Sequence, residues 1–165
     1  MATSIINYYG KNLDIDDNVL QLSLYFIKES FEKNIHKPAW VIQYQNEVID
    51  SMLSIQPTGW GYMDLEEFLT SKNEKDFFIS IIDSCINDLK NRKSKIVDYS
   101  EVNKILNLKG IEKWNEKHYV EVTQIIFFLE NVKILIDDST GLNHPNLMKT
   151  RPFGLSINER KNNEY

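Results

Sequence analysis

The sequence predicts a mainly α-helical fold, a compact bundle of about five to seven helices with room for a short N-terminal strand or hairpin. Apolar residues recur every three or four positions in several segments, which is the spacing of one helix face. Helix-capping residues precede these segments, and a length of 165 residues suffices for one domain with a hydrophobic core. We therefore expect one helical domain over residues 1–141, followed by a polar, loosely packed tail over 142–165.

The first elements are a strand and a long helix. Residues 4–9 suit a small edge strand. In residues 16–34, Val19, Leu22 and Phe26 stand at helical spacing beside a second apolar row, which predicts a helix packed into the core. The acidic and amide residues directly before Val19 can cap this helix.

Two further helices are predicted before residue 70. One begins at Pro38, because proline suits the first helical turn, and continues at steps of three or four to Ile55. Proline and glycine in residues 57–59 end it. Asp64 can cap a short helix in which Glu67 reaches back toward the start.

The remaining helices follow from the same signals. A helix beginning at residues 73–76 extends to Leu89, and a shorter one begins at residues 98–101 and is closed by Gly110. Residues 114–136 suit a buried strand as well as a helix. Their length favours a helix, with a stop at residue 141.

Composition excludes several classes of protein. The net charge of −5 argues against binding to nucleic acid through phosphate contacts. The longest apolar run, 125–129, is too short to cross a membrane, and the N-terminus lacks the pattern of a secretory signal. A lone cysteine, Cys85, excludes an intrachain disulfide framework. We therefore expect a cytoplasmic protein.

Candidate catalytic groups are few and scattered. His36 and His118 each adjoin a lysine, as a ribonuclease-like acid–base pair would require, but surface or capping roles suit them and His144 better. Cys85 lies among apolar residues in mid-helix, where a thiol is not activated. Adjacent carboxylates on a helix point to different faces. We therefore expect no catalytic residue, no metal site and no cofactor, and hence no enzyme.

The charge distribution predicts a protein-binding surface. Acidic residues dominate 47–88, and basic residues dominate 89–117. Aromatic residues beside acidic ones could anchor a basic partner, although solvated helix faces and aromatic residues that brace a turn remain alternatives. The candidate partner-binding residues are Trp60, Tyr62, Asp64, Glu66, Glu67, Glu74 and Asp76.

Several segments carry a family resemblance. They are the opening 9–17, Pro38-Ala39-Trp40, Gln45, Gly59-Trp60-Gly61 leading into 64–69, and the amphipathic helix 74–90. Over residues 8–136 the chain resembles small helical immunity proteins of bacterial polymorphic-toxin and contact-dependent growth inhibition systems. The resemblance implies a cytoplasmic protein without enzymatic activity that binds one cognate toxin domain, often over a nuclease active site.

Three functional hypotheses follow. The first is an immunity protein, or antitoxin, that neutralises a basic toxin nuclease, with no direct contact to nucleic acid or membrane. The second is an adaptor, or a phage or mobile-element protein that inhibits a host factor. The third is a small hydrolase or ribonuclease that uses His36 or His118.

Overall fold

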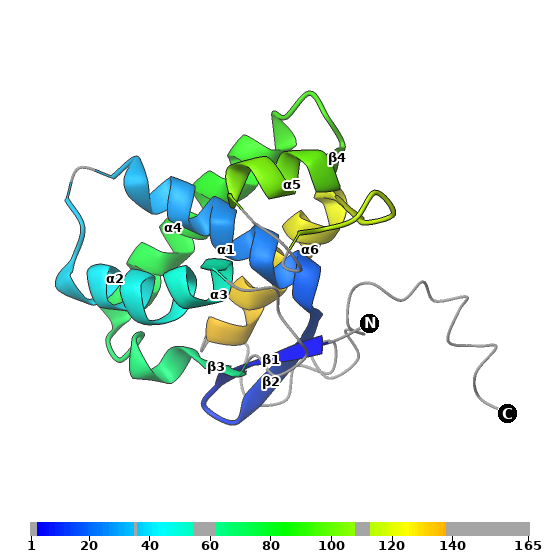
Figure 1. Cartoon of the computed structure of the whole chain (residues 1–165). Coiled ribbons are helices and arrows are strands. Elements are labelled where there is room, and N and C mark those ends of the chain that lie inside the picture. The colour runs from blue at the N-terminus through cyan, green and yellow to red at the C-terminus, as the bar shows by residue number, and fades with distance from the viewer. Residues whose placement is uncertain (1–2, 35, 55–61, 108–112, 138–165) are drawn as a thin grey trace, which may run out of the picture.

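The computed structural model describes residues 3–34, 36–54, 62–107 and 113–137. These residues fold mainly into helices, accompanied by two small sheets (Figure 1). The helices are α1 Asp17–Glu32, α2 Ala39–Tyr44, α3 Asp50–Ser54, α4 Lys72–Lys90, α5 Tyr99–Ile105 and α6 Val122–Ile136. The strands are β1 Thr3–Tyr8, β2 Lys11–Asp16, β3 Tyr62–Asp64, β4 Ile96–Asp98 and β5 Tyr119–Glu121. The predicted mainly helical class is confirmed, although the strands make the fold more than a plain bundle.

The N-terminal strand is part of a hairpin. β1 and β2 pair antiparallel, and β3 joins the other side of β1 in parallel, so the strand order is β2-β1-β3. The predicted strand is therefore present, but its prediction as an edge strand is wrong, because β3 covers its second edge. Inward-facing side chains of this sheet, such as Ile6, Leu13 and Met63, are buried in the core.

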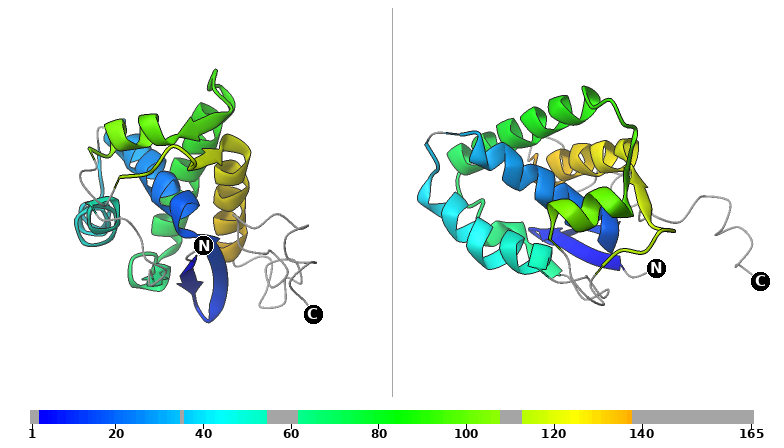
Figure 2. Two further views of the ribbon diagram at one scale, coloured as in Figure 1. Left: turned by 45° about the vertical axis from the view of Figure 1, so that its right-hand side comes forward. Right: turned by 45° about the horizontal axis from the view of Figure 1, so that its top comes forward.

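Helix α1 occupies the centre of the molecule (Figure 2). Asp16 caps its N-terminus, since its side chain accepts from the backbone N–H groups of Asn18 and Val19. The helix packs against α3, α4 and α6. Most residues of its two apolar rows are consequently buried, as the wide apolar stripe predicts.

The second predicted helix is unbroken from Ala39 to Ser54, with a π-helical turn, Gln45–Ile49, between α2 and α3. Pro38 stands at its N-cap, one residue from the predicted start. The predicted stop at residues 57–59 lies outside the described residues. The short helix expected after Asp64 is one 3-10 turn, Leu65–Glu67, which Asp64 caps as predicted.

The later boundaries differ from the prediction at two places. Helix α4 starts slightly before the predicted residues 73–76, because Ser71 is its cap. The prediction of a helix throughout residues 114–136 is wrong at its start, since Tyr119–Glu121 form β5 and only Val122–Ile136 are helical. Antiparallel pairing with β4 stabilises this short strand. The predicted stops at residues 110 and 141 and the tail 142–165 lie outside the described residues.

Aromatic rings fill the centre of the core. Phe78 is 1% exposed, and its ring centroid lies 6.3 Å from those of Phe31 and Trp40 and 5.9 Å from that of Tyr44. These residues come from α1, α2 and α4, so the cluster joins three helices. No helix among the described residues is long and apolar enough to cross a membrane.

Candidate protein-binding surface

The structure describes five of the seven predicted partner-binding side chains. Trp60 lies outside the described residues, and of Tyr62 only the backbone, in β3, is described. Asp64, Glu66 and Glu67 stand at the 3-10 turn that follows β3, and Glu74 and Asp76 stand in the first turns of α4. The carboxylates are therefore grouped where two consecutive elements begin.

Two of these carboxylates hold the N-terminal hairpin in place. The Asp64 Oδ1 atom accepts from Asn7 Nδ2 at 3.2 Å, and it also accepts from the backbone N–H of Glu66 at 3.3 Å. Glu66 Oε2 accepts from the backbone N–H of Tyr9 at 2.9 Å. The turn of the hairpin is thus bonded to the acidic 3-10 turn, although 57 positions separate Tyr9 from Glu66.

Tyr9 is not among the partner-binding residues that the sequence predicts, but the structure places it beside them. It forms the tight hairpin turn with Gly10, and their φ angles of 47° and 76° lie in the left-handed region. This turn type favours asparagine followed by glycine, because a tyrosine there is strained. The side chain of Tyr9 is nevertheless 53% exposed, with its ring centroid 4.7 Å from that of Tyr8. The available sequence signal was a glycine between two segments of alternating apolar residues.

The carboxylates on α4 also have local partners. The Glu74 side chain accepts from the backbone N–H groups of Thr70 and Ser71 at 2.9 and 2.8 Å, which completes a capping box. Asp76 forms an ion pair with Lys72 on the helix surface. Glu67 is exposed, and its carboxylate makes no hydrogen bond or ion pair with the residues that the structure describes.

The hairpin and α4 meet at Tyr8. Its hydroxyl donates to the carbonyl oxygen of Leu69 at 3.4 Å, and Lys75 Nζ lies 6.0 Å from the centroid of its ring. Tyr9 thus directly follows the residue that joins the hairpin to the start of α4, and its own backbone N–H bonds to the 3-10 turn. We call Tyr9, Asp64, Glu66, Glu67, Glu74 and Asp76 the acidic turn surface.

Replacing Glu74 by glutamine is expected to make the free energy of unfolding less dependent on pH in the acidic range. Hydrogen bonds from Thr70 and Ser71 hold the pKa of Glu74 below its ordinary value. Its ionised form therefore stabilises the fold above the ordinary carboxyl pKa, and this contribution is lost as the pH falls through the lowered pKa. Glutamine keeps the capping acceptor without the charge.

Urea unfolding measures this effect at about pH 7 and about pH 3. The free energy of unfolding of the wild-type protein should exceed that of Glu74→Gln by more at the higher pH. Glu67→Gln is the matched control, since it removes an exposed carboxylate from the same surface without a capping bond. Equal differences at the two pH values would show that the Glu74 charge contributes nothing.

The candidate catalytic groups are not brought together. Cys85 is buried, and burial raises the pKa of its thiol to about 12, far from that of an activated nucleophile. His36 follows the C-terminal end of α1, whereas His118 packs on Trp114, which bonds to Gln21 near the other end. Gln21 and the end of α1 are about 16 Å apart along the helix axis. His144 lies outside the described residues.

The described part of the chain contains no group of three or more histidine, cysteine, aspartate or glutamate side chains that could hold a metal ion. The acidic turn surface instead offers one exposed tyrosine ring beside carboxylates, and tyrosine is among the residue types that contribute most to protein interfaces. Comparison with protein-family models, curated proteins and solved structures finds no match for this chain.

Proposed function

We propose that this protein is an immunity protein that binds a cognate toxin domain, a basic nuclease, through its acidic turn surface and blocks the nuclease active site. The observation that carries the proposal is Tyr9, an exposed aromatic residue held in a left-handed backbone conformation beside carboxylates. The family resemblance of residues 8–136 suggests the same class of function.

The conformation of Tyr9 is costly for folding alone. A residue with a side chain loses about 1–2 kcal/mol in the left-handed region, whereas glycine or asparagine avoids most of this cost. The ring recovers little by burial, because about half of it is exposed. A tyrosine at this turn is better explained by binding, since rigid tyrosines at the centre of an interface contribute much of its affinity.

The fixed carboxylates favour a basic partner. Asp64, Glu66 and Glu74 accept hydrogen bonds from neutral donors, so their positions are set while their charges persist. Preorganised charges reduce the cost of ordering side chains on binding, and an acidic surface speeds encounter with a basic protein. Nucleases are commonly basic because they bind phosphate groups.

Calorimetric titration of the full chain tests the proposal. The titrant is the C-terminal domain encoded by the open reading frame immediately upstream, because an immunity protein is expected to accompany its toxin. We expect one-to-one binding with a dissociation constant of about 1 nM or tighter, loss of the domain's activity, and an association rate that falls with added salt. Absence of binding at micromolar concentrations would overturn the proposal.

Replacing Tyr9 by asparagine is expected to separate binding from folding. Asparagine tolerates the left-handed region, so the free energy of unfolding should be unchanged or higher, while loss of the ring should weaken toxin binding at least about tenfold. Tyr119→Asn is the control, because Tyr119 is 60% exposed on β5, outside the acidic turn surface. Equal effects of the two substitutions on the dissociation constant would place the interface elsewhere.

A further inference from the structure

A pocket of about 230 Å³ lies between α1, α4 and α5. The pocket-lining residues of α4, Cys85 to Leu89, lie in its C-terminal half, whereas Glu74 and Asp76 of the acidic turn surface lie in its first turns, so the pocket is separate from that surface. Tyr25 and Phe26 of α1 line it with aromatic rings, and Leu89 and Ile105 add apolar contacts. Its volume is below that of pockets for drug-sized ligands, which limits the ligand to about one amino-acid unit.

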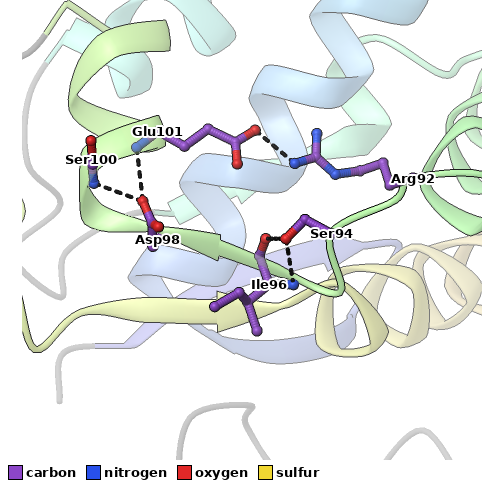
Figure 3. A network of polar contacts seen from close by, with 6 residues as sticks. All are labelled: Arg92, Ser94, Ile96, Asp98, Ser100 and Glu101. Atoms are coloured by element: carbon purple, nitrogen blue, oxygen red, sulfur yellow. Dashed lines mark hydrogen bonds and ion pairs between the residues drawn. The ribbon is translucent and has the colours of Figure 1, made fainter.

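The lining of the pocket carries three carboxylates and two cationic side chains. Arg92 Nη2 lies 2.6 Å from Glu101 Oε1 (Figure 3), and Lys33 forms a second ion pair with Asp88. Within each pair the positive and negative charges cancel. The Glu29 carboxylate makes no hydrogen bond or ion pair with the described residues, so the lining carries an excess negative charge.

Arg92 has hydrogen-bond donors to spare. Its guanidinium group bonds to Glu101, yet its buried Nε atom has no hydrogen-bond partner among the described residues. The Cζ atom lies 5.4 Å from the ring centroid of Phe26, which helps to hold the group in place. A guanidinium group carries five N–H donors, and only the bond of Nη2 to Glu101 is made with the described residues, so an oxygen atom from a ligand would find a donor on the terminal nitrogens of Arg92.

We propose that this pocket binds an arginine or lysine unit, with its cationic group toward Glu29 and its carbonyl or carboxylate oxygen toward Arg92. The ring of Tyr25 would contact the ligand's aliphatic stem. A purely anionic ligand would meet the carboxylates of Glu29, Asp88 and Glu101, and an apolar ligand would desolvate the charges without compensating them. This site does not depend on the proposed immunity function.

The unit has two possible sources, a residue of a protein chain or a free amino acid, and ¹H–¹⁵N NMR titration of the full chain distinguishes them. The probes are Nα-acetyl-arginine methylamide, free arginine, the neutral isostere Nα-acetyl-citrulline methylamide and Nα-acetyl-aspartate methylamide. We expect shifts at the pocket residues, with the blocked arginine bound at least about fivefold more tightly than the citrulline probe. Tighter binding of free arginine than of blocked arginine would indicate a free amino acid as the ligand, and the reverse order a residue of a chain.

Two results would overturn the proposal. One is the absence of pocket shifts with either arginine probe at about 50 mM, a concentration that detects even weak affinity. The other is a stronger response to the aspartate probe, which would show that the pocket selects anions.

A variant tests the assigned role of Glu29. Glu29 is on the exposed side of α1, so Glu29→Gln should leave folding intact. The blocked arginine and citrulline probes should then bind with about equal affinity, because the substitution removes the negative charge that favours a cation. Glu116→Gln, an exposed carboxylate outside the pocket, should leave the preference unchanged. A preference that persists in Glu29→Gln would contradict the assignment.

Discussion

Replacing Phe78 by alanine is expected to lower the free energy of unfolding by about 3–5 kcal/mol, the range for removal of a buried aromatic side chain. The ring is almost fully buried and contacts Phe31, Trp40 and Tyr44 from two other helices. Alanine would leave a cavity lined by large rings, which cannot collapse without moving α1 or α2. A loss of this size is a large part of the total stability of a domain of this length.

The neighbouring residue Phe77 is the matched control. It lies on the same helix but is only half-buried, with its ring centroid 5.9 Å from that of Trp40. Phe77→Ala should therefore reduce the free energy of unfolding by about 1–2 kcal/mol. Urea denaturation measures both variants, and the dependence of the free energy on urea concentration should be the same in the two. Equal losses at the two positions would mean that the aromatic cluster is not the centre of the core.

The helices could be predicted because their signals are local. Apolar periodicity predicts α1 and α4, and the residues at 16–18 and 98–101 mark the starts of α1 and α5, where Asp16 and Asp98 are the caps. The predicted start of α4 at residues 73–76 is too late, because Ser71 caps the helix instead of Asn73. Ser71 prevails because Glu74 stands three residues later and bonds back to the cap, whereas the residue three positions after Asn73 is Asp76, whose shorter side chain pairs with Lys72.

The strands were harder to predict, because most of them form by pairing with a segment that is distant in the sequence. Tyr119–Glu121 is too short for its alternation to be informative, and its pairing of Val120 with Val97 forms only in the folded chain. The central position of β1 likewise follows from its pairing with β3, which comes after α1, α2 and α3 in the sequence. Short segments of apolar residues do not reveal such pairings.

The candidate sites were predictable to different degrees. Charge patterning selects the carboxylates from Asp64 to Asp76, and the structure places them on two consecutive elements. It gave no account of their hydrogen bonds to the hairpin, since Asn7 and Tyr9 are far away in the sequence. The pocket lined by Glu29 and Arg92 also escaped prediction, because its walls come from three separate helices.

The segment around Trp114 illustrates how a loop is fixed to the helices. Trp114 is 2% exposed, and its indole Nε1 donates to Gln21 Oε1 of α1 at 3.1 Å. Its backbone N–H and carbonyl both bond to the side chain of Asn103 on α5, each at 2.8 Å. One amide side chain thus satisfies a buried donor and a buried acceptor that lie outside regular secondary structure.

Replacing Asn103 by leucine is expected to lower the free energy of unfolding by about 2–3 kcal/mol, because two hydrogen bonds are lost and both backbone groups of Trp114 are left without these partners. Asn87→Leu is the control, since Asn87 is exposed on α4 and the same substitution there should change stability by less than about 0.5 kcal/mol. Urea unfolding measures both values. If the two variants were equally stable, packing of the indole and its bond to Gln21 would suffice to hold this segment, and Asn103 would contribute nothing.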